Sequence, residues 1–288
     1  MKHTGSLLLI LAFILPAALP VRAEDDLRLD FTAEANKKLL NNRLTVGLSA
    51  NARTQDNTSQ MDGYALELGG TYKLIDRKKY GLKFGLAYEH SWVKRLGECE
   101  QRYKTKYYKD KFDYIGDGQF EAIEKGYNTG YNYDAAYWRG RSRLSLSMAF
   151  SYRLSKRLYL TLKETMQYKH YYGTWTERTK YRNKVRYGEE STDVVETYMK
   201  EKRAKDRWML RSKLTMQYSK KRCPWEPFVS AELGCGVGYT AYKWKFTAGT
   251  DYKISKQHTL NVFYRYQTEN DEDALNVHIV GVGYGFKF

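Results

Sequence analysis

The chain has 288 residues, of which 15% are aromatic, and a formal net charge of +16. This length allows one domain or at most two, and after the first two dozen residues no apolar run is long enough for a membrane-spanning helix. So basic a chain indicates contact with anions. The three cysteines have a spacing that predicts no metal site and no dense disulfide framework, although Cys223 and Cys235 could pair in an oxidising compartment.

The first residues predict a secretory signal peptide, residues 1–23. Lys2 and His3 form a short basic start, an apolar run follows at residues 7–19, and Ala23 ends a small-residue cleavage site. The apolar run is shorter than the roughly 20 residues of a membrane-spanning helix, so an uncleaved anchor is disfavoured. Removing Lys2 and Arg22 leaves a charge of about +14. An exported protein is not expected to bind nucleic acid, which leaves lipopolysaccharide, acidic lipids or acidic polymers.

From Leu27 onward, apolar side chains recur at every second position along the chain. Leu44, Val46 and Leu48, for example, alternate with Thr45 and Ser49. A period of two is typical of a strand with one apolar and one polar face, and no helical period competes with it. Eleven such stretches predict an all-β meander: residues 27–35, 44–52, 64–74, 82–92, 144–154, 158–168, 208–218, 229–233, 242–252, 260–266 and 280–288.

Strand length and loop length both favour a membrane barrel. Soluble strands average about 5–6 residues, whereas a tilted membrane-spanning strand needs about 9–11, as most of these stretches have. Short connections (75–79, 155–157, 219–225, 254–257) alternate with connections that include two long insertions at about 93–136 and 173–206. Short turns on one side and long loops on the other are typical of outer-membrane barrels.

Aromatic residues on the apolar face gather at the strand ends, with Leu, Val, Met and Ala between them. Two aromatic girdles around an aliphatic belt are expected where strands cross both membrane interfaces. The girdle residues are Trp92, Trp138, Trp208, Tyr242, Trp244 and Tyr264 at the long-loop end, and Tyr72, Phe84, Tyr152, Tyr218, Tyr252, Tyr284 and Phe286 at the short-turn end.

These patterns predict a transmembrane antiparallel up-and-down β-barrel, with residues 24–288 as a single domain and long extracellular strand extensions. Bacterial single-chain barrels have even strand numbers, so 10 or 12 strands are expected although eleven stretches are visible. Three explanations stay open: one strand is split, one is missed, or residues 24–36 thread through the lumen.

The chain ends in HIVGVGYGFKF, an alternating strand with an aromatic last residue. Tyr284, Phe286 and Phe288 resemble the assembly signal of Gram-negative outer-membrane barrels, which implies the barrel assembly machinery as a partner. The segments DRWMLRSKLTMQY, PFVSAELG and EANKKLLNNRLTVGLSANARTQDNTSQMDGYALELGGTYKL resemble an uncharacterised, domain-of-unknown-function family of such barrels. That resemblance covers most of the chain outside the insertions, implies the architecture, and transfers no active site.

The inward face is predicted to be basic, with far more cations than carboxylates. If opposite charges pair, the lumen is plugged by a hydrogen-bonded network; if positive charge survives, the lumen is a cationic channel or pocket. The predicted lumen-facing bases are Arg139, Arg141, Arg143, Lys163, Arg207, Arg211, Lys213, Lys243, Lys245 and Arg265.

No catalytic constellation is visible in the sequence. His90 and Ser91 are adjacent, but consecutive strand residues point to opposite faces, so they cannot form a nucleophile–base pair. His278 lies near Asp271, Glu272 and Asp273, which are read as a solvated loop tip. No catalytic residue, cofactor or metal is therefore predicted.

The insertions carry tyrosines among lysines, and bases at alternate positions of 173–206, namely Arg178, Lys180, Arg182, Lys184 and Arg186. This spacing predicts strands that continue beyond the membrane. Such bases could contact lipopolysaccharide phosphates and the tyrosines could stack on glycans, or the insertions could be hydrated loops that shield the rim.

Together these features predict a porin-like protein of the outer membrane that binds or passes an anionic or glycan ligand. The alternatives are a barrel enzyme acting on lipid or envelope components, a plugged structural barrel, and a secreted soluble β protein.

Overall fold

The computed structural model describes residues 25–104, 112–116, 119–122, 128–186, 189–221, 223–236, 242–270 and 276–288. The expected signal peptide and the acidic residues 271–273 lie outside these ranges. The described chain is all-β, as predicted, and contains no helix that could cross a membrane. Its described residues group into two compact units. The first unit holds the described residues up to Val93, those of Gly140–Tyr172 and those of Lys205–Phe288, and the second holds those of Lys94–Arg139 and Gly173–Ala204, which approximate the two predicted insertions.

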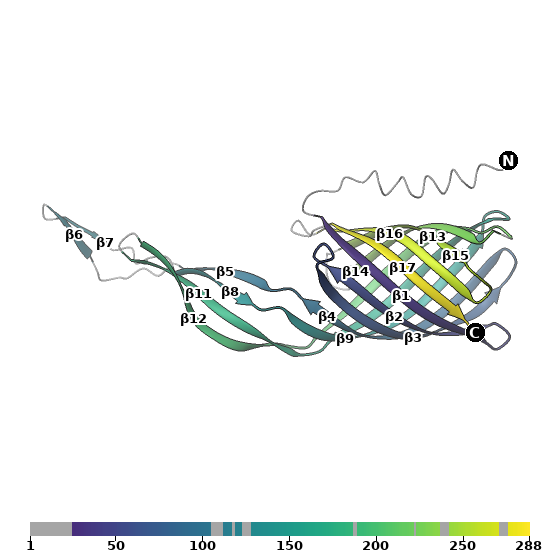
Figure 1. The fold of residues 1–288 in the computed structure, drawn as a ribbon, viewed down its shortest axis with the longest axis horizontal. Helices are drawn as coiled ribbons and strands as arrows, with labels where there is room; N and C mark the ends of the chain where they lie inside the picture. The colour runs from purple at the N-terminus through teal and green to yellow at the C-terminus, as the bar shows by residue number, and fades with distance from the viewer. Residues whose placement is uncertain are drawn as a thin grey trace. The chain divides into compact units, whose positions relative to one another are not determined.

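The first unit is a closed barrel of eleven strands, in the order β1-β17-β16-β15-β14-β13-β10-β9-β4-β3-β2 (Figure 1). Each alternating stretch of the sequence becomes one barrel strand. Closing the sheet places the polar face of every strand inside the barrel and the apolar face outside. The strands are β1 (Asp26–Leu39), β2 (Leu44–Gln55), β3 (Gln60–Asp76), β4 (Tyr80–Arg95), β9 (Tyr137–Arg153), β10 (Leu158–Tyr171), β13 (Lys205–Tyr218), β14 (Trp225–Gly236), β15 (Tyr242–Lys253), β16 (His258–Glu269) and β17 (Val277–Lys287).

The strand number corrects the expected 10 or 12. In a meander of eleven strands the first and last point the same way, so the barrel closes through one parallel pair. β1 and β17 pair in parallel from Asp26↔Val277 to Asn36↔Lys287, and all other neighbours for which a register is given pair antiparallel. Figure 1 shows β1, in purple, beside β17, in yellow. Among the described residues of the barrel no predicted strand is split or missed, and residues 26–39 form part of the wall instead of threading the lumen.

Hydrogen bonds join β1 and β17 at both ends of their parallel pairing, which is called the parallel seam below. At one end the amide of Asp26 donates to the carbonyl of Asn276 over 2.9 Å, and at the other the amide of Phe288 donates to the carbonyl of Asn36 over 2.9 Å. His278 Nε2 also lies 3.0 Å from Asp25 Oδ2. The terminal strands are therefore tied together over the whole length of the seam.

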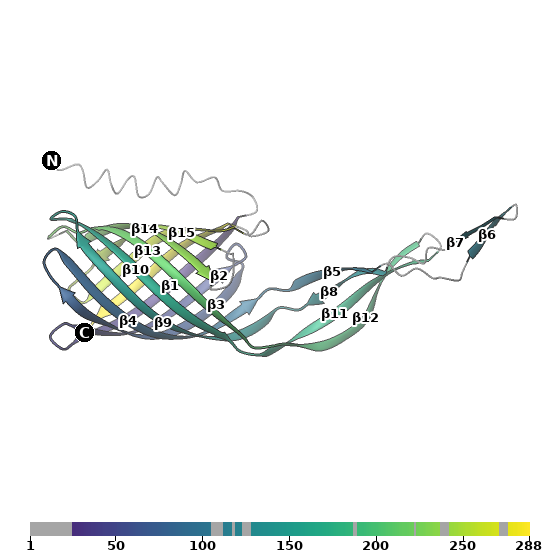
Figure 2. The same ribbon diagram turned by 180° about the vertical axis from the view of Figure 1, so that it is seen from behind.

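Burial in the barrel is the reverse of that in a soluble protein. Among the described residues only Val277 and Ile279 are buried apolar side chains, whereas Asp30, Glu89 and Gln167 are buried polar ones. Leucine, methionine and aromatic side chains are exposed on the outward faces of β4, β9, β10 and β13. These four strands are neighbours in the barrel wall (Figure 2). The predicted alternation is thus confirmed, with the polar phase inside and the apolar phase outside.

The second unit contains the two insertions and is also made of strands. β12 (Glu189–Lys202), β11 (Thr174–Arg186), β8 (Asn128–Asp134) and β5 (Glu98–Lys104) form a four-stranded antiparallel sheet in that order. A separate hairpin pairs β6 (Phe112–Gly116) with β7 (Gln119–Ala122). Residues 173–206 thus form strands, as their alternating bases indicated, but these strands belong to a sheet separate from the barrel.

Candidate functional site

The polar face of the barrel wall lines a partly open cavity of about 410 Å³. Its lining includes backbone at Gly69 and Gly85, where the absence of side chains leaves room, and hydroxyl groups such as those of Ser147 and Thr165. Four predicted lumen bases line it, together with three carboxylates: Arg143, Lys163, Arg211 and Lys213, with Glu34, Glu67 and Glu232.

Two arginines of β9 pair with carboxylates of β3 and β4. Arg143 donates to Glu67 over 3.0 Å and also to Glu89, and Arg141 donates to Glu89 over 3.2 Å. The Arg141 Nε group also bonds to Ser91 Oγ at 3.0 Å. These arginines are therefore neutralised by carboxylates on β4 and β3, as the plugged-lumen alternative expects.

A second paired group is centred on Glu232 of β14. Arg211 Nε donates to Glu232 Oε1 over 2.8 Å, and Lys245 Nζ lies 3.2 Å from the same oxygen. Arg265 of β16 pairs with a different carboxylate: its guanidinium lies 3.8 Å from Asp30 of β1. One carboxylate shared by two cations leaves positive charge over in this part of the wall.

Lys163 and Lys213 form the exception inside the cavity. They are direct cross-strand partners on β10 and β13. Within the part of the chain that the structure describes, neither ammonium lies within the 4.0 Å ion-pair distance of a carboxylate oxygen. Like charges directly opposite each other destabilise a sheet. An anion bound between them would remove that penalty, so this pair is the strongest candidate for a ligand contact.

The remaining predicted bases do not line the cavity. Lys243 pairs with Glu269, Arg207 lies over the ring of Tyr171 at 5.9 Å, and Arg139 belongs to the second unit, where it donates to the carbonyl of Arg203. Periodicity predicts the face of the strand on which a residue lies, but it carries no information about the height of that residue along the barrel.

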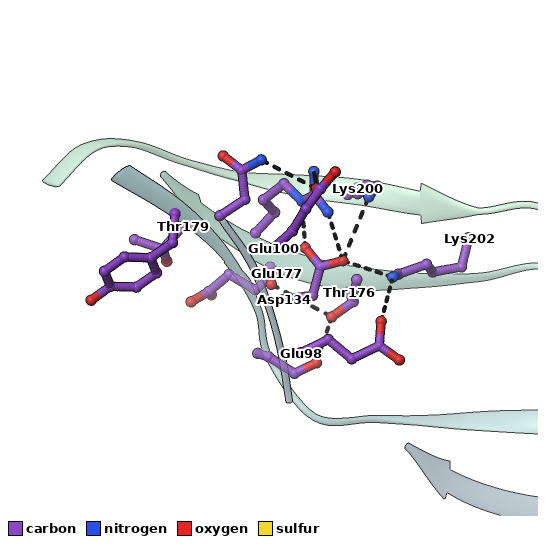
Figure 3. Close-up of polar contacts among 12 residues, drawn as sticks. Glu98, Glu100, Asp134, Thr176, Glu177, Thr179, Lys200 and Lys202 are labelled. Atoms are coloured by element: carbon purple, nitrogen blue, oxygen red, sulfur yellow. Dashed lines mark hydrogen bonds and ion pairs between the residues drawn. The ribbon is translucent and has the colours of Figure 1, made fainter. Parts of the chain in front are cut away.

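In the second unit, charged side chains of the four-stranded sheet form ion pairs with one another (Figure 3). Asp134 of β8 accepts from Arg178 Nη2 over 2.9 Å and from Lys202 Nζ over 2.7 Å, while Arg178 also lies 3.1 Å from Glu100. The bond from Arg178 lowers the pKa of Asp134 well below its usual range against the opposing effect of burial, and the same bond raises the pKa of Arg178.

This pairing accounts for part of the predicted row of bases in 173–206. Lys180 pairs with Glu196, and Arg182 donates to Asn132 Oδ1 over 3.1 Å. The side chains of Lys184 and Arg186 lie outside the described ones. The carboxylates that neutralise the row come from other strands, so they carry no signal in the spacing of the bases.

The C-terminal residues follow the predicted alternation. Tyr284 and Phe288 are exposed, at 43% and 69%, and the Phe286 and Phe288 rings meet edge to face at 4.6 Å. Cys99, Cys223 and Cys235 are all free thiols, so the pairing of Cys223 with Cys235 that the sequence left open does not occur.

No family model matches the chain, and no curated protein matches it. Among solved structures it is similar to the "CymD monoaromatic hydrocarbon channel", with 11% identity and a TM-score of 0.32 over 90% of this chain and 87% of that chain. At that score the likeness carries no weight, and the barrel rests on the strand pairing of this chain alone.

Proposed function

We propose that this protein is an integral barrel of the outer membrane, delivered there by a cleaved signal peptide, that binds and passes small anionic ligands through its lumen. The inverted burial supports the membrane setting, because an exposed apolar belt around a closed sheet is stable in lipid and costly in water. Insertion through the assembly machinery and contact with lipopolysaccharide are part of the proposal, as is membership of the uncharacterised outer-membrane barrel family.

The observation that carries the ligand class is the Lys163–Lys213 pair in the cavity. Arginines nearby have carboxylate partners on neighbouring strands, whereas the two lysines place adjacent positive charge in a space about 410 Å³ in volume. A carboxylate or phosphate group would bridge two such ammonium groups by charge-assisted hydrogen bonds.

The test is conductance of the refolded mature protein in a planar bilayer, with reversal potentials in a salt gradient. We expect anion-selective current, and we expect the double variant Lys163→Gln/Lys213→Gln to bring the anion/cation permeability ratio toward one. Lys256→Gln, in the exposed turn between β15 and β16, is the matched control and should keep the wild-type ratio. A correctly inserted but silent barrel would contradict passage and favour a plugged structural role.

A further inference from the structure

A cluster of hydroxyl and imidazole groups lies on the outward face of the barrel. His90 Nδ1 of β4 is 3.2 Å from Ser142 Oγ of β9. The same oxygen lies 2.7 Å from the hydroxyl of Tyr172 and 2.9 Å from that of Tyr88. Ser142 is thus the centre of a network drawn from three strand segments that are far apart in the sequence.

Strand geometry explains why adjacency in the sequence does not reveal this contact. Ser91, next to His90 in the chain, faces inward, is 2% exposed, and bonds to Arg141 of the neighbouring strand. Ser142 shares the outward phase of β9 with the exposed Leu144 and Leu146. The nucleophile–base contact therefore forms across the β4–β9 pair and not along β4.

The cluster lies at the level of the aromatic girdle, where the strands end away from the short turns. The imidazole of His90 packs against the ring of Trp92, edge to face at 4.5 Å, and against the ring of Tyr172 at 5.7 Å. Trp and Tyr mark the headgroup level of a bilayer, with the acyl chains beginning just below them. That depth is where the ester bonds of membrane lipids lie.

We propose that Ser142 and His90 form a catalytic dyad that cleaves acyl esters of membrane lipids. The Ser142 oxygen forms a bond to the ester carbonyl carbon while its proton passes to His90 Nδ1. The bond between the carbonyl carbon and the alkoxy oxygen of the lipid then breaks, and His90 returns the proton to the departing alkoxide. Water attacks the acyl carbon while His90 again takes a proton. The bond from that carbon to Ser142 Oγ then breaks, and His90 returns the proton to Oγ, so one ester and one water yield an acid and an alcohol and restore the serine.

The two tyrosines supply the second requirement of acyl transfer, which is stabilisation of the oxyanion. The hydroxyl groups of Tyr88 and Tyr172 lie 2.9 Å and 2.7 Å from the attacking oxygen, and each can turn its O–H toward the carbonyl oxygen of an ester bound beside Ser142, which would carry negative charge. His90 contacts no carboxylate within the described residues, so its ring is held by Trp92 and Tyr172 instead. The site is accordingly a dyad without an acidic third member.

The inference depends on the proposed membrane insertion but not on the lumen site. Its test is covalent labelling of the refolded protein in detergent micelles by a fluorophosphonate, which transfers its phosphonyl group to an activated serine and releases fluoride. We expect the wild type to be labelled, Ser142→Ala to lose the label, and His90→Gln to react about 100-fold more slowly, as loss of a general base predicts.

Ser91→Ala is the matched control, because it makes the same change one face away and should keep wild-type labelling. Each variant is first shown to be folded by its compact migration on an unheated gel. Release of free fatty acid from mixed micelles of a glycerophospholipid is the second readout, and it should follow the labelling. A folded wild type that neither labels nor releases fatty acid, or equal labelling of Ser142→Ala, would overturn the proposal.

Discussion

Asp134 shows how a single carboxylate can organise a thin sheet. It is 2% exposed, and it accepts hydrogen bonds from Arg178 and Lys202, which lie on different strands. A four-stranded sheet cannot bury a large apolar core, so ion pairs that bridge its strands contribute a larger share of its stability. The ionised carboxylate is favoured because the pKa of Asp134 lies well below its usual range.

We predict that Asp134→Asn destabilises the second unit by about 1–3 kcal/mol, because the buried Arg178 and the partly buried Lys202 lose a charged acceptor. The measurement is a urea titration followed by a fluorophore on Cys99 of β5, with Cys223 and Cys235 replaced by Ser. Glu196→Gln, which removes the more exposed pair with Lys180, is the control and should cost at most about 1 kcal/mol. Equal effects of the two variants would contradict the role given to Asp134.

The pH dependence of the same titration has a defined sign. The pKa of Asp134 is lower in the folded state than the unfolded value of about 3.9. Asp134 therefore stabilises the fold fully at pH values above about 3.9, and this contribution is lost as the pH falls from about 3.9 toward the folded-state pKa. The raised pKa values of Arg178 and Lys202 contribute stability below the ordinary values of these groups. The urea midpoint should therefore be flat from pH 5 to 8 and fall below pH 4. Asp134→Asn should reduce that acid-side fall.

At the scale of the element, β17 combines an apolar outer face with an inner face of glycines. The absence of side chains at these positions makes room for the neighbouring strand's inward residues. The ring of Phe263 on β16 lies over Gly281, where an added Cβ would come within 2.0 Å of its Cζ atom. Arg265 lies over the same ring at 4.7 Å, so an aromatic side chain forms part of the otherwise polar inner wall.

We predict that Gly281→Ala destabilises the barrel by about 1–3 kcal/mol, since the Phe263 ring must leave its position. Gly283→Ala is the matched control on the same face, because its added Cβ would meet the nearest atom, of Asn261, at an ordinary 3.4 Å. The free energy of unfolding of each variant is measured by urea titration of the barrel inserted in lipid vesicles. The double variant Gly281→Ala/Phe263→Ala should lose less than the two single changes together, whereas simple additivity would contradict the contact.

At the scale of the whole molecule, one parallel seam accounts for the odd strand number. β1 bonds to β2 on one side and to β17 on the other, so it has no free edge. A barrel without β1 would have ten strands and an ordinary antiparallel closure, which is the architecture that the even-number rule favours. The insertion of β1 between β2 and β17 is therefore what distinguishes this eleven-stranded barrel from a ten-stranded one.

A cross-linking experiment tests the seam. Thr32 and Gly283 are register partners on the inward face. In a variant free of native cysteines, Thr32→Cys/Gly283→Cys should be joined in high yield by a short thiol cross-linker. Thr32→Cys/Tyr284→Cys is the control, because Tyr284 is on the outward face and should react poorly. Failure of the first pair to react in an inserted barrel would contradict the parallel closure.

The strands and their two faces could be predicted from the sequence, because a period of two is a local property of consecutive residues. It separates outward Leu144 and Leu146 from inward Arg141 and Arg143 without reference to any other strand. For the same reason the all-β class, the eleven alternating stretches and the continuation of strands into the second insertion were readable from the chain alone.

Everything that depends on which residues lie opposite each other was decided by the tertiary structure. Strand register brings Glu89 to Arg143, Lys163 to Lys213 and Ser142 to His90. It also pairs Glu164 with Ser212 on the otherwise apolar outer face, at 2.6 Å. Register and closure arise from hydrogen bonds between distant segments, so neither the parallel seam nor the partners of the charged side chains leave a trace in local periodicity.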